Sequence, residues 1–345
     1  MADGFIRNQW YVAANADEVG DKPLGRVLCG EPVVLYRKRD GAVVALLDRC
    51  PHRKLPLSLG TVRGDEIQCG YHGVTLNAEG VCTAIPSQSG PVPKGFGVRA
   101  FAVVERHKLI FVWIGESARA DERLIPDWSV NDKPGWTTVF GYQHVVANHL
   151  LILDNLLDLT HLPFVHGAVL GGDGYAENAL EVEIESDAVR LRRPMPNVAQ
   201  SPLIALTRKF AGQGNVDRAQ TSEFRAPGYV FIGLWVGPLG KPDELSILYA
   251  VVNSVTPESD GSSHYFWSVA RSAALDDASV SAEFHRLTVA AFDQDRIVLE
   301  AQQRAVDLDT SGAPLVNFRD DRAGVAARRI LARLLAEQEQ VPRVA

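Results

Sequence analysis

Cys50-Pro51-His52 and, sixteen residues later, Cys69-Gly70-Tyr71-His72 each place one cysteine and one histidine almost side by side. Each cluster directly follows a strand-like run, residues 43–47 before the first and residues 65–68 before the second. Two loops that project from neighbouring strands can hold one object from two sides. We therefore expect these loops to share a metal centre in a domain of short strands.

The ligand types narrow the choice of metal. Two thiolates and two imidazoles are the ligands of a Rieske [2Fe–2S] centre, in which two cysteines hold one iron and two histidines hold the other. Structural zinc is the alternative, but zinc fingers pair cysteine with cysteine and histidine with histidine. Each loop here carries one of each. The pattern therefore favours a Rieske cluster on Cys50, His52, Cys69 and His72.

Composition excludes several classes of protein. The 345 residues, about two domains at ~150 residues each, are 46% hydrophobic and 22% charged, as in globular proteins. A net charge of -7 argues against a basic nucleic-acid-binding face. Four cysteines are too few for a disulfide scaffold and suit a reducing compartment. The longest apolar stretches, such as residues 229–236, fall short of the ~20 that a membrane helix needs. We expect a cytoplasmic protein with neither nucleic-acid nor membrane partners.

The pattern of the chain changes near residue 118. Before it, short β-rich runs alternate with glycine and proline turns, which predicts an all-β domain over residues 1–118. The expected strands there are 26–28, 33–37, 43–47, 98–104 and 109–114. Over residues 119–345 we expect strands at 180–184, 224–236, 245–255 and 263–270, and helices at 149–161, 276–307 and 325–339. A block of strands between helices predicts an α+β domain, with an antiparallel sheet wrapped on helices in a helix-grip-like arrangement.

A second group of polar residues lies within a leucine-rich segment. Asn155, Asp158 and His161 recur every three residues, so on one helix they form a stripe. Such a stripe is costly to bury unless it is paired or binds something. On a straight helix His166 points about 140° away from His161. We therefore expect Pro163 to end or kink the helix and to let both imidazoles converge.

Two histidines and one carboxylate form the facial triad of non-haem Fe(II) oxygenases, which leaves positions open for O2 and substrate. The later helix offers Asp293 and Asp295 as the third ligand. Asp295 shares its helix face with apolar residues such as Leu299, whereas Asp293 shares its face with charged ones. We therefore expect Asp295 to join His161 and His166 at an iron. The alternative is that both histidines are ordinary buried residues.

Taken together, the two groups resemble the oxygenase component of Rieske non-haem iron oxygenases over most of the chain. The stretch after the second loop also matches that family, although Val74 and Leu76 stand where many relatives carry aromatic residues. The matching positions are Tyr71-His72-Gly73, Gly80, Cys82 and Ile85-Pro86. The short chain and one further segment are most similar to the vanillate O-demethylase and dicamba monooxygenase group. That segment reads Asp154-Asn155-Leu156-Leu157-Asp158-Leu159-Thr160-His161.

The resemblance implies a terminal monooxygenase for aromatic compound catabolism. It would use O2 and NAD(P)H electrons, delivered by a separate flavin reductase with or without a ferredoxin, to demethylate a methoxyaromatic compound and release formaldehyde. N-dealkylation of an aromatic amide or amine, and ring hydroxylation, use the same metal centres and stay open.

The family also suggests an assembly and an electron route. It implies a homotrimer in which electrons pass between neighbouring subunits through Asp158, whose carboxylate would bond His161 and the next chain's counterpart of His72. Asn155 is expected near the iron without ligating it. Substrate is expected between the sheet and the helix that carries His161. Candidate pocket positions are Val230, Asn253 and Arg286.

Two readings from other classes compete with an oxygenase. A pure electron-transfer protein would need the first domain alone, and the set of His161, His166 and Asp295 speaks against it. A zinc-stabilised binding module would be colourless, whereas a Rieske protein is red-brown.

Overall fold

The computed structural model describes residues 4–167, 175, 178–313 and 315–340. The chain divides into two compact units, one of Met1–Ile125 with Thr256–Ser259 and one of Pro126–Val255 with Asp260–Ala345. Among the described residues, no helix has the length and apolar character that a membrane span requires.

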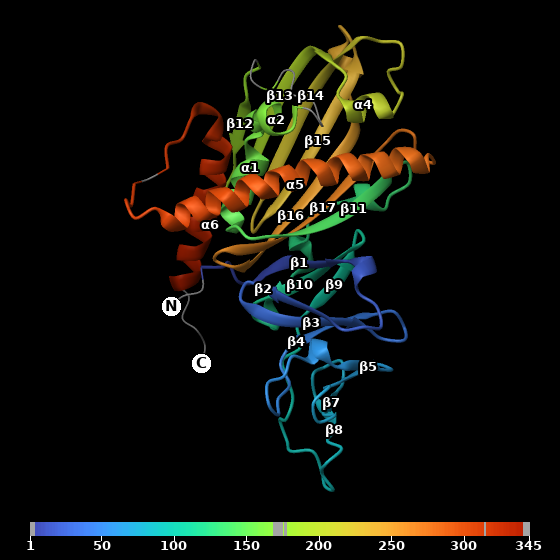
Figure 1. Cartoon of the computed structure of the whole chain (residues 1–345), viewed down its shortest axis with the longest axis vertical. Helices are drawn as coiled ribbons and strands as arrows, with labels where there is room; N and C mark the ends of the chain where they lie inside the picture. Colours follow the sequence, from blue (N-terminus) through green and yellow to red (C-terminus); the bar gives the residue numbers. More distant parts are fainter. Residues whose placement is uncertain (1–3, 168–174, 176–177, 314, 341–345) are drawn as a thin grey trace. The chain divides into compact units, whose positions relative to one another are not determined.

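The first unit is built of short antiparallel strands (Figure 1). They are β1 (Gln9–Asn15), β2 (Leu24–Leu28), β3 (Glu31–Arg37), β4 (Val43–Leu47), β5 (Thr61–Arg63), β6 (Glu66–Gln68), β7 (Thr75–Leu76), β8 (Cys82–Ala84), β9 (Val103–Arg106) and β10 (Leu109–Ile114). They pair as the sheets β1-β10-β9, β2-β3-β4 and β5-β6-β7-β8. One apolar core of this unit contains Cys50, Cys69 and Cys82 beside Leu57 and Ile67, so both predicted metal loops start from a packed base.

One expected strand of this unit is wrong. The run 98–104 forms strand only from Val103 onward. Before it, Ala100 makes an isolated antiparallel bridge with Leu46, flanked by two main-chain hydrogen bonds, from Phe101 to Ala45 and from Leu47 to Arg99. Residues 99–101 therefore run antiparallel beside β4, but the pairing is too short to form a strand.

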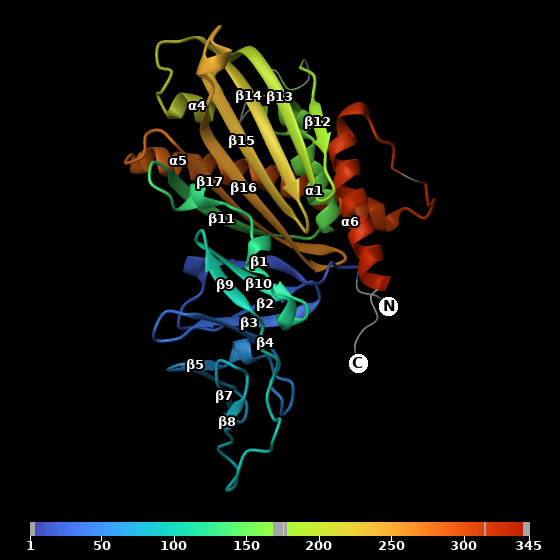
Figure 2. The same ribbon diagram turned by 180° about the vertical axis from the view of Figure 1, so that it is seen from behind.

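The second unit pairs a large sheet with helices. Its strands are β11 (Thr137–Val145), β12 (Glu181–Ile184), β13 (Ala188–Ala199), β14 (Asn215–Arg225), β15 (Tyr229–Pro238), β16 (Ser246–Ser259) and β17 (Ser262–Arg271). Its helices are α1 (His149–Leu157), α2 (Leu162–Val165), α4 (Pro202–Leu206), α5 (Ala278–Leu308) and α6 (Arg322–Gln340). Within the described residues, the antiparallel order is β11-β17-β16-β15-β14-β13-β12. Figures 1 and 2 show α1 and α5 on the same face of this sheet. The predicted fold class is confirmed.

Two details of the strand prediction were wrong. The run 224–236 is two strands, β14 and β15, joined by the turn at residues 226–228. Strands β11 and β13 were not predicted. In β13 the outward positions carry Arg190 and Arg192 and the strand contains Pro194, so its sequence lacks the apolar run that marked the others.

Candidate metal centres

The chain breaks its helix at Asp158, five residues before the expected break at Pro163. Helix α1 ends at Leu157, and Asp158 is extended with φ -121° and ψ 106°. Its carboxylate accepts hydrogen bonds of 2.9 Å from both the main-chain N–H and the hydroxyl of Thr160. This cap starts a 3-10 turn over Leu159–His161. Pro163 lies in the first turn of α2, where its missing N–H costs nothing.

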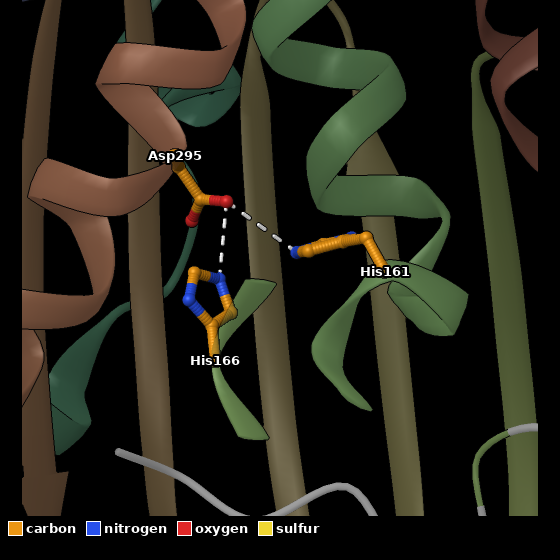
Figure 3. Close-up of side chains that lie close together, drawn as sticks. All are labelled: His161, His166 and Asp295. Atoms are coloured by element: carbon orange, nitrogen blue, oxygen red, sulfur yellow. Dashed lines mark ion pairs between the residues drawn. The ribbon is translucent and has the colours of Figure 1, made fainter. Parts of the chain in front are cut away.

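The break brings His161 and His166 together with Asp295 of α5 (Figure 3). The Nε2 atom of His166 lies 3.0 Å from Oδ1 of Asp295, and Nε2 of His161 lies 3.5 Å from the same oxygen. The ligand atoms of all three residues lie within 4.8 Å of one another. Asp295 and His166 are buried and His161 is partly buried. The expected triad is thus one compact cluster.

The remaining atoms of the cluster fit a bound cation. Nδ1 of His161 donates to the main-chain oxygen of Asp158 at 2.7 Å, and Nδ1 of His166 donates to Oε1 of Gln294 at 2.9 Å. Because these oxygens only accept, both Nε2 atoms of the neutral rings present lone pairs. Two lone pairs aimed at a carboxylate need a positive ion between them. A ligating histidine held through its other nitrogen is the usual arrangement at metal sites.

Asn155 completes this arrangement. Its Nδ2 donates to Oδ1 of Asp295 at 3.0 Å. The amide therefore fixes the carboxylate and leaves it free to ligate through its lone pairs. Asn155 therefore lies beside the cluster of His161, His166 and Asp295.

Burial and the shared carboxylate act differently on the two rings. Burial lowers the pKa of His161, and this effect is larger than the opposite effect of the Asp295 charge, so the pKa is lowered overall. Burial also lowers the pKa of His166, but the nearby carboxylate of Asp295 outweighs it and leaves this pKa raised, so a positive charge is favoured at this position. The closer approach of His166 to Asp295 accounts for the difference.

One expected contact differs from the structure. The carboxylate of Asp158 caps the turn through Thr160, and it is the main-chain oxygen of Asp158 that holds His161. The predicted carboxylate contact with His161 is therefore wrong within the chain. Asp293 points away from the cluster as expected, with a half-exposed carboxylate that accepts a hydrogen bond of 2.9 Å from Gln143.

The second predicted metal group lies at the ends of two strands of the first unit. Cys50 follows β4 and Cys69 follows β6, and both residues are buried in the same apolar core. His52 and His72 are exposed, and their ring centroids lie 4.6 Å apart. Thiols inside and imidazoles outside are consistent with a cluster whose iron pair has one sulfur side and one nitrogen side.

Tight turns hold both loops in this shape. The N–H of Lys54 donates to the oxygen of Cys50, and the N–H of Gly73 donates to the oxygen of Cys69. Gly73 has φ +72°, and a Cβ there would lie 2.9 Å from the ring of Pro86. The loop therefore requires glycine at this position.

An internal cavity of about 100 Å³ lies between the triad and the sheet. Its wall is mostly apolar. The helices and loops contribute Asn155, Leu156, Leu159, His161, Leu162, His166, Tyr175, Leu203, Thr288, Ala291, Phe292 and Asp295, and the sheet contributes Gln220, Ile232, Leu234, Tyr249, Val251 and Val269. A cavity of ~150 Å³ accepts benzene, so this space is of the right order for one aromatic ring.

The three expected pocket positions do not line this cavity. Val230 and Asn253 share a sheet face with Ile232, but lie further along the strands, where the hydroxyl of Tyr265 donates to Asn253 at 2.6 Å. Arg286 is exposed on α5 and pairs with Glu283. Alternation along a strand predicts which face of the sheet a side chain lies on, but not whether its position along the strand is beside the cavity.

Sequence reasoning missed Gln220 and Tyr175, which both line the cavity. Gln220 stands in a mostly polar stretch of β14, with Arg218 and Ser222 as its neighbours on the same face, so no apolar pattern in the sequence marked it. Tyr175 follows the histidine segment in a stretch without periodicity, and no pattern marked it.

Comparison with known proteins agrees with these centres. Residues 9–102 match the Rieske [2Fe-2S] domain, and residues 145–337 match the vanillate O-demethylase oxygenase C-terminal domain. The chain is 37% identical to the vanillate O-demethylase oxygenase subunit of Pseudomonas sp. (strain HR199 / DSM 7063) over 97% of this chain and 96% of that one. It is 37% identical to a toluene-4-sulfonate monooxygenase system iron-sulfur subunit of Comamonas testosteroni, over 96% and 97%.

The fold is similar to dicamba monooxygenase bound to 3,6-dichlorosalicylic acid, with a TM-score of 0.92, 34% identity, and coverage of 98% of this chain and 99% of that one. Members of this family carry a Rieske cluster and a mononuclear non-haem iron, and they receive electrons from reductase or ferredoxin partners. The predicted family, enzyme class and cofactors are confirmed. The chain therefore belongs to the vanillate O-demethylase oxygenase family and is the oxygenase component of a Rieske iron monooxygenase.

Proposed function

We propose that this oxygenase O-demethylates a methoxylated aromatic acid. The observation that carries the proposal is the cluster of His161, His166 and Asp295 at the wall of an apolar cavity of ring size. The names of the relatives support the substrate class, since vanillate, toluene-4-sulfonate and 3,6-dichlorosalicylic acid are all aromatic acids.

The reaction balances with one O2 and two electrons. One oxygen atom is inserted into a methyl C–H bond, and the other leaves as water with two electrons from NAD(P)H and two protons. The resulting hemiacetal loses formaldehyde and leaves a phenol. The bound iron would supply the activation of O2.

The side chains of this chain have separate tasks in that reaction. His161, His166 and Asp295 would hold the iron, and Asn155 would fix the carboxylate of Asp295. Cys50, His52, Cys69 and His72 would hold the electron-transfer cluster. The apolar cavity wall would exclude water and so limit side reactions that consume electrons without oxidising the substrate.

The same proposal covers the organisation of the protein. Residues 1–118 would form the cluster domain and residues 119–345 the iron domain. We further propose a cytoplasmic homotrimer, without membrane attachment, in which electrons pass between neighbouring subunits. The four free cysteines support a reducing compartment.

The main-chain oxygen of Asp158 holds His161, and a contact of its carboxylate with the cluster histidine of the neighbouring subunit would make Asp158 sensitive to charge removal. Replacing Asp158 by asparagine keeps an oxygen that can accept the N–H of Thr160, so the turn should persist. We expect turnover to fall more than about 100-fold, by analogy with the upper range for residues that hold metal ligands, while iron and cluster contents stay unchanged. Thr160→Val is the matched control, since it removes the hydroxyl partner and keeps the carboxylate. Full turnover by Asp158→Asn would refute the bridge.

The reaction class is tested with purified protein, a surrogate reductase, NADH and O2. The substrates are methoxybenzoates, N-alkyl anilides and the corresponding benzoates without a methoxy group. We expect equal amounts of formaldehyde and phenol from a methoxybenzoate. An aldehyde from the anilides alone would favour N-dealkylation, and a hydroxylated ring without formaldehyde would favour ring hydroxylation. Either outcome would replace the proposal.

A further inference from the structure

The sheet contributes two residues with polar side-chain groups to the cavity wall, Tyr249 and Gln220 of β14. The side chain of Gln220 is buried, with 6% of the residue exposed. The hydroxyl of Tyr175 donates a short hydrogen bond to Oε1 of Gln220. Nε2 makes no hydrogen bond with any residue that the structure describes. With Oε1 occupied, the amide N–H groups are the free donors at this wall.

A buried donor without an acceptor costs free energy, which a ligand oxygen can recover. The triad residues lie on the helices and loops that line the cavity, whereas Gln220 lies on the sheet. A ring bound between them can therefore direct one substituent to the triad and another to Gln220.

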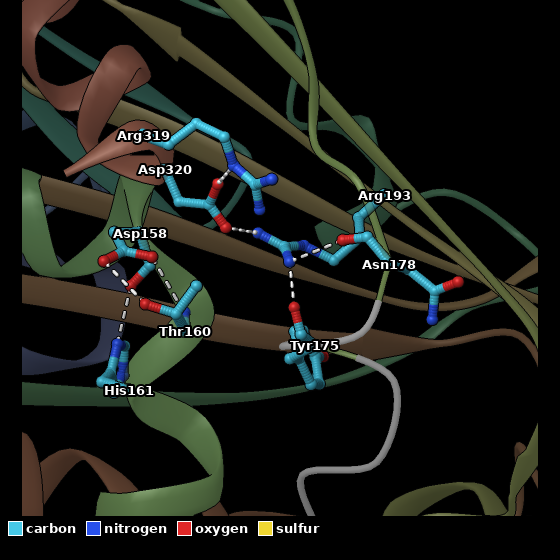
Figure 4. Close-up of polar contacts among 8 residues, drawn as sticks. All are labelled: Asp158, Thr160, His161, Tyr175, Asn178, Arg193, Arg319 and Asp320. Carbon is cyan, nitrogen blue, oxygen red and sulfur yellow. Dashed lines mark hydrogen bonds and ion pairs between the residues drawn. The ribbon is translucent and has the colours of Figure 1, made fainter.

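Tyr175 is itself held in place through its main chain (Figure 4). Arg193 of β13 is buried, and its Nη1 donates to the main-chain oxygens of Tyr175 and Asn178. Its Nη2 pairs with Asp320 at 3.3 Å, on the 3-10 turn Arg319–Asp321 that precedes α6. Arg193 therefore fixes the main chain of Tyr175, whose hydroxyl reaches Gln220, and this fixes the direction of the amide.

Two guanidinium groups lie close to Tyr175, and one of them, that of Arg193, is paired with Asp320. The guanidinium of Arg218, also on β14, lies 5.3 Å from the centroid of the Tyr175 ring. Burial raises the pKa of Tyr175, while the charges of Arg218 and Arg193 act in the opposite direction. An anionic oxygen near the Tyr175 hydroxyl is favoured chiefly by the charge of Arg218, because Asp320 compensates that of Arg193.

We propose that Gln220 is the specificity-determining residue that binds the acidic group of the aromatic substrate through its Nε2, with Tyr175 and Arg193 as positioning residues. This inference rests on the proposed function and deepens it, because it assigns the carboxylate to the sheet wall and the methoxy group to the triad.

The test compares ligands that differ only in the acidic group. Titration calorimetry under argon, without a reductase, gives Kd for 3- and 4-methoxybenzoate and for the matching methoxytoluenes. The variants are Gln220→Leu, which removes the donor, and Gln220→Glu, which keeps the acceptor for Tyr175 and adds a negative charge. Ser222→Ala is the matched control. Ser222 lies two residues along the same strand, outside this cavity wall, and borders only a small adjoining cavity that it shares with Gln220.

We expect the wild-type protein to prefer a methoxybenzoate over its methoxytoluene. Gln220→Leu should weaken benzoate binding about 10- to 100-fold, the range for a hydrogen bond to a charged group, and leave methoxytoluene binding within about threefold. Gln220→Glu should weaken benzoate binding further, and Ser222→Ala should change neither ligand. Equal losses for both ligands, unchanged benzoate binding by Gln220→Leu, or no wild-type preference would overturn the assignment.

The failure of the proposed reaction gives a different result. If the wild-type protein binds methoxybenzoates with the Gln220-dependent preference but releases no formaldehyde, the proposed O-demethylation is wrong and the assignment of Gln220 to the acidic group is supported. If formaldehyde is released with no Gln220-dependent preference, the proposed O-demethylation is supported and the assignment of Gln220 is wrong.

Discussion

Replacing Asp295 by asparagine is expected to lower turnover more than about 100-fold and to leave the Rieske absorption spectrum unchanged. Even the loss of a partner that only orients a metal ligand costs about 10- to 100-fold, and Asp295 supplies the anionic oxygen that faces both imidazoles. An asparagine there keeps the volume but removes the charge. NADH-dependent substrate consumption measures turnover, and the visible spectrum of the oxidised protein reports the cluster.

Asp293→Asn is the control for this substitution. Asp293 lies on the same helix, two residues away, with a half-exposed carboxylate that pairs with Gln143 and Arg296 outside the cluster. It should retain turnover within about threefold, as expected for a surface change. A comparable loss of turnover in the two variants would mean that the loss comes from removing a negative charge from α5, and Asp295 would then not be an iron ligand.

Replacing Cys69 by serine is expected to abolish the cluster and with it all turnover. The thiol is buried against that of Cys50 in the core of the first unit, so no other cysteine can take its place without moving the loop. We expect a colourless protein without the rhombic EPR signal of a reduced Rieske centre.

The matched control is Cys82→Ala. Cys82 belongs to the same core and its thiol contacts only the main-chain oxygen of Ala84 among the hydrogen bonds of the described residues. This variant should stay red-brown and active, apart from the cost of a small cavity. A colourless Cys82→Ala, or a red-brown Cys69→Ser, would show that the cluster lies elsewhere.

The sequence predicted the chemistry of the chain better than its local geometry. The spacing of Cys50, His52, Cys69 and His72 is specific because each loop must present one thiolate and one imidazole. Asp295 could be chosen over Asp293 because a helix of 31 residues without proline or glycine assigns its faces reliably. The sheet was predicted where apolar runs mark its strands.

The errors have a common physical origin. Asp158 breaks the helix because its short carboxylate satisfies the N–H and hydroxyl of Thr160, a local bond that competes with the helix and that periodicity does not detect. The prediction of the pocket residues was wrong because the register of the sheet decides which part of β15 lies beside the cavity, and Val230 lies beyond that part. Gln220 and Tyr175 meet only through the fold, 45 residues apart in sequence.

The central claim, two separate iron centres on one chain, is tested most directly by the metal content of three purified proteins. Elemental analysis should find about three irons per chain in the wild type, two in the cluster and one at the triad. Asp295→Asn should keep about two, and Cys69→Ser about one. Zinc in place of iron at either centre, or an Asp295→Asn protein that keeps all its iron, would contradict the account.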